Sequence, residues 1–211
     1  MVFSRDVLFL HVPKTGGMSV TRFLLSALPG TVYYTALEPQ DDDCGAVFLK
    51  GIRHETLADA REILSREGLS LDAIPVILAV IRNPYEIEVS RYHYLRKGYR
   101  WDRRYDQALA LTRDFETFVL RARPHAGVSR QLADYFSLDG ERPPNLVMLR
   151  CESLAEDLEK ALAGVALKSP VILPRETSPT TAMSPSTTPA GPKLPSTTDT
   201  SGCSMRVSTI G

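Results

Sequence analysis

Short apolar runs alternate with segments of helical periodicity along residues 5–174. The run at 74–81 is too apolar for a strand with one solvated face, so we expect it at the centre of a parallel sheet covered on both sides. Further strands are predicted at 7–12, 46–50 and 145–149. Strands that alternate with helices predict an α/β fold, with a mostly parallel sheet between two layers of helices.

The helices are predicted from apolar spacing and from their terminal residues. Apolar side chains at positions 20, 23, 24, 27 and 28 indicate an amphipathic helix that ends at Pro29-Gly30. Asn83 and Pro84 are typical of an N-cap and a first helical residue, and we expect that helix to run to about residue 94. Other helices are predicted at 56–67, 114–122, 127–136 and 153–163.

The composition changes abruptly after residue 174. In residues 175–211, Ser, Thr and Pro make up more than half of the positions, and no Phe, Tyr or Trp occurs. Such a segment cannot bury enough apolar surface to offset its ordering entropy. We therefore expect an α/β domain at 1–174 and a disordered tail at 175–211.

Charge and cysteine content exclude several classes of protein. Twenty-five basic residues balance twenty-five acidic ones, so we expect no nucleic-acid partner. No apolar run approaches the roughly 18 residues of a membrane span, and no secretory signal is recognisable. Cys44, Cys151 and Cys203 form neither a metal-binding spacing nor a disulfide framework, so we expect a cytoplasmic protein without a bound metal.

The first candidate site is the sequence HVPKTGGMS at 11–19, between the first strand and its helix. Gly16 and Gly17 let backbone N–H groups approach an anion, and the helix start adds positive potential. Lys14 supplies a point charge, and Thr15 and Ser19 supply hydroxyls. This pattern indicates a phosphate-binding loop, but Lys14 precedes the glycines, unlike the lysine of the nucleoside-triphosphate loop. The alternative is a tight turn that carries a surface lysine.

The second candidate site begins at Arg82, at the carboxyl end of the predicted central strand. Open α/β sheets bind ligands at that end of their strands, and a guanidinium can hold a phosphate through two hydrogen bonds. Ser90, about two turns into the next helix, can donate to the same group. The alternative is an arginine that caps a neighbouring helix and a serine that fills a small space.

Together, these two segments resemble the sulfotransferase superfamily, which uses 3′-phosphoadenosine 5′-phosphosulfate (PAPS). HVPKTGGMS resembles its 5′-phosphosulfate loop, and RNPYEIEVSRY at 82–92 resembles its 3′-phosphate motif. The HxPKTGG form is most similar to the carbohydrate branch related to heparan-sulfate 2-O-sulfotransferases. The resemblance covers about residues 5–174 and includes KGIRHET (50–56), FETF (115–118), QLADY (131–135) and RCESLAED (150–157).

The resemblance implies a P-loop-like sulfotransferase fold and sulfuryl transfer from PAPS to an acceptor hydroxyl, with a carbohydrate as the expected acceptor. Lys14 would neutralise the oxygen that joins the sulfate to the leaving phosphate. Arg82 and Ser90 would bind the 3′-phosphate. The 5′-phosphate would be held by the backbone of Thr15, Gly16, Gly17, Met18 and Ser19.

His54 is the candidate base, because it follows the strand at 46–50 as the family's base does. A histidine, whose ordinary pKa is about 6.5, suits proton transfer near neutral pH. The alternative is a solvent-facing histidine at a helix start. We expect His11 to pack behind the loop. The basic, aromatic stretch at 96–105 either grips an acceptor or forms a solvated loop.

Some positions depart from the family pattern. Met18 stands where Thr or Ser is usual, Glu86 and Glu88 place negative charge near a phosphate site, and the tail replaces a Tyr- and Asp-rich continuation. A one-nucleotide shift of reading frame in a GC-rich gene would account for a Ser/Thr/Pro-rich tail, and we state it as a hypothesis. Two alternatives to an active sulfotransferase stay open: a non-catalytic nucleotide-binding remnant, and a nucleotide kinase, which the lack of a triphosphate loop disfavours.

Overall fold

The computed structural model describes residues 1–39, 44–97, 104–122 and 132–173, all within one compact unit, Met1–Glu176. The predicted tail at 175–211 lies outside the described residues, as do most of the basic stretch at 96–105 and the first part of the helix predicted at 127–136. The described end of that helix, Leu132–Tyr135, is a short 3₁₀ helix.

A six-stranded sheet forms the centre of the fold, with the strand order β4-β3-β1-β2-β5-β6. Strands β2, β5 and β6 pair in parallel, and so do β3 and β4. The short strand β1 is antiparallel to both of its neighbours. The prediction of an α/β fold with a mostly parallel sheet is therefore confirmed. The strands are β1 (Val2–Phe3), β2 (Val7–Leu10), β3 (Tyr33–Ala36), β4 (Val47–Lys50), β5 (Val76–Ile81) and β6 (Leu146–Arg150).

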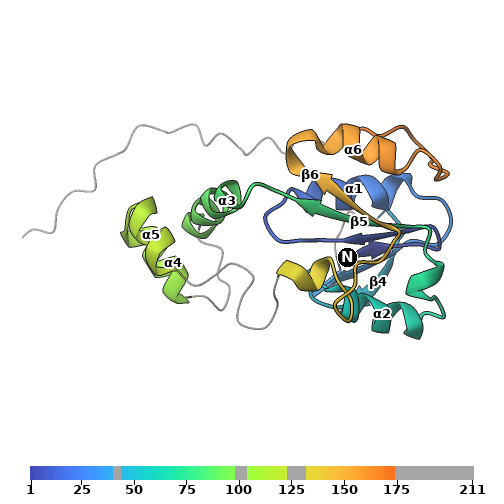
Figure 1. Cartoon of the computed structure of the whole chain (residues 1–211), viewed down its shortest axis with the longest axis horizontal. Coiled ribbons are helices and arrows are strands. Elements are labelled where there is room, and N and C mark those ends of the chain that lie inside the picture. Colours follow the sequence, from blue (N-terminus) through green and yellow to red (C-terminus); the bar gives the residue numbers. More distant parts are fainter. Residues whose placement is uncertain (40–43, 98–103, 123–131, 174–211) are drawn as a thin grey trace, which may run out of the picture. The chain divides into compact units, whose positions relative to one another are not determined.

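Helices cover both faces of this sheet. Helices α1 (Gly17–Ala27) and α6 (Leu154–Ala161) lie on one face, and α2 (Leu57–Arg66) lies on the other (Figure 1). Strand β5 supplies alternate side chains to the two layers: Leu78 and Val80 pack with α1 and α6, and Ile77 and Ala79 pack with α2. Its burial on both faces explains why this strand is apolar at every position.

The predicted helix starts are present where the sequence provides caps. Asn83 caps α3 (Pro84–Arg96): its side chain accepts a hydrogen bond from the backbone N–H of Tyr85 at 3.0 Å. Thr56 and Asp59 form a capping box at the start of α2. The side chain of Asp114 caps α5 (Phe115–Arg121) by accepting a hydrogen bond from the backbone N–H of Thr117 at 2.7 Å.

Helix α4 (Arg104–Thr112) corrects the sequence analysis, which predicted no helix there. Its Asp106 carboxylate is fully buried and lies 2.9 Å from the Arg91 guanidinium of α3. Leu95, Ala110 and Phe118 form a small apolar core among α3, α4 and α5. The apolar periodicity of the sequence did not indicate this helix, because one of its buried positions is the charged residue Asp106. A charged side chain is buried only where a partner such as Arg91 pairs with it.

Candidate functional site

Strands β2, β4, β5 and β6 point in the same direction, so the described loops that follow them all lie at the carboxyl-terminal end of the sheet. They carry residues 11–16, 51–56, 82–83 and 151–153. Both candidate sites of the sequence analysis, and His54 with them, therefore lie at the carboxyl ends of parallel strands, where α/β sheets bind ligands.

The loop at 11–16 makes a tight turn into α1. Lys14 and Gly16 both adopt positive φ, 63° and 86°, and Gly16 is the residue that precedes the helix. The hydroxyl of Thr15 is buried and donates to the Val12 carbonyl at 2.9 Å. That hydroxyl closes the loop, and the role predicted for it toward a ligand stays a prediction. Half-buried Met18 and Ser19 form the first helical turn with Gly17.

His11 packs behind this loop, as predicted, and its ring requires Gly17 to be glycine. A Cβ built on Gly17 would lie 2.6 Å from the Nε2 atom of His11. The imidazole is buried, with 4% of its surface exposed, and it stacks edge-on against the ring of His54 at a centroid distance of 4.8 Å. Gly17 is therefore fixed by packing against His11.

Replacing Gly17 with alanine is expected to destabilise the fold by about 1–3 kcal/mol, because the new methyl group overlaps the buried ring of His11. The free energy of unfolding by urea measures this effect. Gly164→Ala is the matched control, because a Cβ there meets nothing within 4 Å, and a change below about 0.5 kcal/mol is expected. Equal effects of the two substitutions would show that His11 does not constrain Gly17.

Arg82 joins the two predicted sites. Its Nη1 donates to the Lys14 carbonyl at 3.3 Å, and its Nη2 donates to Glu86 at 2.7 Å. The guanidinium has further N–H groups beyond these two bonds, and its side chain remains 23% exposed. The motif after β5 thus contacts the loop after β2 directly, and Arg82 can still bind an anion.

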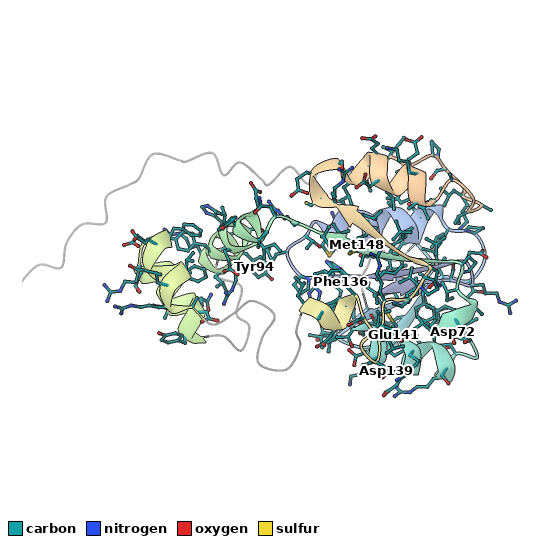
Figure 2. The ribbon with its side chains drawn as sticks, viewed as in Figure 1. Asp72, Tyr94, Phe136, Asp139, Glu141 and Met148 are labelled. Carbon is teal, nitrogen blue, oxygen red and sulfur yellow. The ribbon has the colours of Figure 1, made fainter. Side chains whose placement is uncertain are left out.

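One stripe of α3 faces this region. Glu86, Ser90 and Tyr94 follow one another at four-residue intervals and so share one side of the helix. Glu86 contacts Arg82, and the Lys14 ammonium lies 3.9 Å from the centre of the Tyr94 ring. Tyr94 extends from α3 toward the sheet (Figure 2). Because Ser90 lies between these two contacts, the structure places it on the side of α3 that faces the Lys14 loop.

His54 lies beside the same loop, in a fixed orientation. Its Nδ1 atom is 2.8 Å from the carbonyl oxygen of His11. A carbonyl only accepts, so Nδ1 carries the proton and Nε2 keeps its lone pair. The Tyr135 hydroxyl donates to the His54 carbonyl at 3.2 Å. Burial lowers the pKa of His54, and the hydrogen bond to the His11 carbonyl only partly opposes this, so the imidazole is neutral at pH 7.

The stability of the protein is expected to fall as the pH is lowered from 7 to 5. Burial holds the pKa of His11 well below its ordinary value and lowers that of His54. In that range the unfolded chain therefore binds protons that the native imidazoles do not, and the free energy of unfolding decreases. Denaturant unfolding at several pH values measures the slope.

His93→Gln is the control for this slope, because His93 is exposed and its loss should leave the slope unchanged. His11→Gln should reduce it. A free energy of unfolding that stays constant between pH 7 and 5 would contradict the burial of neutral imidazoles at this site.

Sequence reasoning missed several residues of this region. Arg53 donates to the Met18 sulfur at 3.4 Å, and the Glu152 carboxylate accepts from the Asn83 backbone at 3.2 Å. Arg53 and Glu55 lie within the segment KGIRHET, which carried the only sequence signal for them. Tyr94 could have been identified from its position four residues after Ser90 on the same predicted helix.

The arrangement can bind an anion and accept a proton. Arg53 contacts the first turn of α1, Arg82 contacts the backbone of Lys14 in the loop before it, and His54 contacts the backbone of the same loop. Within residues 1–39, 44–97, 104–122 and 132–173, no group of three His, Cys, Asp or Glu side chains is placed to hold a metal ion. Over the same residues, the helices are too short or too polar to cross a bilayer.

Comparison with protein-family models gives no match, and searches of curated proteins and of solved structures give none either. The function of this site is therefore inferred from its own geometry and from its sequence motifs.

Proposed function

We propose that the chain is a PAPS-dependent sulfotransferase that modifies a hydroxyl group, with a carbohydrate as the acceptor. The observation that carries the proposal is the hydrogen bond from Arg82 to the Lys14 carbonyl, 3.3 Å long, which joins two motifs 68 residues apart. The 5′-phosphosulfate and 3′-phosphate motifs of one nucleotide site must lie this close. A P-loop-like sulfotransferase fold is part of the proposal, and the order and direction of β2, β5 and β6 are compatible with it.

The residues present suit the donor substrate. The first turn of α1 and the loop before it would offer backbone N–H groups to the 5′-phosphate, and the exposed Gly16 places no side chain over them. Arg82 and Ser90 would bind the 3′-phosphate, which distinguishes this donor from ATP. Thr15 contributes through its backbone, because its hydroxyl closes the loop.

Sulfuryl transfer depends on positioning and on charge stabilisation. The acceptor oxygen bonds to sulfur while the bond from sulfur to the bridging oxygen of the 5′-phosphate breaks. Adenosine 3′,5′-bisphosphate leaves, and the proton of the acceptor hydroxyl passes to Nε2 of His54. Lys14 would neutralise the charge that develops on the bridging oxygen.

Calorimetric titration with adenosine 3′,5′-bisphosphate and with ATP tests the nucleotide preference. We expect binding of the bisphosphate to be tighter by about tenfold or more, because Arg82 has no 3′-phosphate to bind in ATP. Transfer of labelled sulfate from PAPS to a panel of desulfated glycans tests the reaction. Preference for ATP would support a nucleotide kinase and overturn the proposal.

The second candidate, a non-catalytic remnant, gives a different result. The segment at 175–211 stands where the family continues with a Tyr- and Asp-rich stretch. Binding of the bisphosphate without sulfate transfer to any glycan would favour that candidate. The same assay on a protein with the tail in the shifted reading frame would then show whether the continuation is required.

A further inference from the structure

A buried carboxylate lies beneath the loop that carries His54. Glu55 is 2% exposed, and both of its oxygens accept hydrogen bonds. Oε1 accepts from the backbone N–H groups of Ile52 at 2.8 Å and Arg53 at 3.2 Å. Oε2 accepts from the Thr35 hydroxyl at 2.7 Å and from the Met1 ammonium at 3.0 Å. One side chain thus joins Met1, the residue before β1, to β3 and to the loop after β4.

These bonds fix a strained backbone. Arg53 adopts a φ of 72°, a left-handed conformation that is uncommon for a residue with a side chain. The Glu55 carboxylate binds its N–H, and the Met1 ammonium donates to its carbonyl at 2.7 Å. Gly51 completes the arrangement, because a Cβ there would lie 3.0 Å from Cβ of Thr35 and would also overlap Oε1 of Glu55. Strain of this kind persists only where surrounding contacts determine the conformation.

The strained turn directs two side chains toward the candidate site. The Arg53 guanidinium reaches the Met18 sulfur in the first turn of α1, at 3.4 Å. A thioether is a weak acceptor, so the guanidinium keeps N–H groups for a stronger one. The next residue, His54, places Nδ1 at 2.8 Å from the His11 carbonyl. Both orientations depend on the backbone that Glu55 holds.

Burying a carboxylate is costly unless it is fully paired, and a neutral side chain would stabilise a plain turn at lower cost. The buried charge of Glu55 instead stabilises the turn at residues 52–53, directly before the candidate base His54. The geometry points to Glu55 as a positioning residue of the site, one that sets the tautomer and direction of His54 and the direction of Arg53. The catalytic part of this inference rests on the proposed function, whereas the positioning part concerns the ligand-free protein.

The test compares the full chain with Glu55→Gln, which keeps the shape of the side chain. The amide oxygen can still accept from Ile52, but the NH2 group then faces the Thr35 hydroxyl and the Met1 ammonium as a donor. Long-range ¹H–¹⁵N NMR of the imidazoles reports the tautomer, and loss of signals in His54→Gln assigns His54. In the unaltered chain we expect a single Nδ1–H tautomer, and in Glu55→Gln a mixture of both tautomers.

Asp106→Asn is the matched control. Asp106 is another fully buried carboxylate paired with a cation, but it lies in α4 and contacts Arg91. Both variants lose stability, and only Glu55→Gln is expected to alter the signals of His54. An unchanged Nδ1–H tautomer in folded Glu55→Gln would overturn the inference. If Glu55→Gln does not fold, Thr35→Val, which removes one donor to Oε2, gives a smaller shift of the same signals, and their constancy there would also overturn it.

The catalytic part has a separate readout. With PAPS, Glu55→Gln should lower kcat by about 10²-fold through misplacement of the base, while the affinity for adenosine 3′,5′-bisphosphate changes less than about threefold. An equal loss of kcat in Asp106→Asn would overturn this part. Absence of sulfate transfer by the unaltered chain would overturn the proposed function, and the NMR comparison would still decide whether Glu55 positions His54.

Discussion

Replacing Lys14 with alanine is expected to lower the turnover number for sulfate transfer by about 10²–10³-fold, the usual cost of removing one charge-stabilising group. The Lys14 ammonium lies over the Tyr94 ring, 3.9 Å from its centre, on a loop that Arg82 holds by its carbonyl. The side chain is therefore directed toward α3, the helix that also carries Ser90. Its charge matters most when the bridging oxygen becomes negative, so turnover falls more than nucleotide affinity.

Steady-state kinetics with PAPS and calorimetry with adenosine 3′,5′-bisphosphate separate these two effects. Lysine and alanine both carry a Cβ, so the cost of the left-handed backbone conformation at position 14 is about the same in Lys14→Ala as in the unaltered chain. Lys160→Ala is the control, since Lys160 is an exposed lysine paired with Glu156 on α6. Turnover within about threefold of the unaltered chain would remove Lys14 from the mechanism.

Much of the fold could be predicted because its signals are local. Strand β5 is apolar at every position, and the residues that begin α2 and α3 cap those helices through bonds to their own first turns. Strands β1 and β3 were missed for the opposite reason. Val2–Phe3 is too short to show a period, and Tyr33–Ala36 becomes a strand through its pairing with β1 and β4.

In the candidate site, too, residues with a local sequence signal were predicted, and residues that depend on distant partners were not. Lys14, Gly17 and Arg82 were predicted because each follows a strand in a recognisable motif, and strand direction then brings the motifs to one edge. The hydrogen bond from the Thr15 hydroxyl to a carbonyl three residues back was not predicted, because the motif alone does not reveal such a local acceptor. Glu55 was not predicted, because its partners are Thr35, in a strand that the pattern did not reveal, and Met1, just before another such strand.

The structure sharpens what Arg82 is expected to do. Its Nη1 holds the Lys14 carbonyl, and its Nη2 holds Glu86, so it has a role in the loop as well as toward a ligand. Loss of one such hydrogen bond costs about 0.5–1.5 kcal/mol and affects every nucleotide that uses the loop. Any further loss must come from the 3′-phosphate itself. The difference between two nucleotides, rather than one affinity, therefore measures the predicted contact.

Arg82→Ala is expected to weaken binding of adenosine 3′,5′-bisphosphate by about 2–4 kcal/mol, the cost of truncating one partner of a buried charge pair. Binding of adenosine 5′-phosphosulfate, which lacks the 3′-phosphate, should weaken only by the free energy lost with the hydrogen bond from Arg82 to the Lys14 carbonyl. Calorimetry with both ligands gives the two losses. Arg61→Ala is the control, because Arg61 is an exposed arginine on α2 paired with Asp139. Equal losses for both ligands would mean that Arg82 supports the loop and does not recognise the 3′-phosphate.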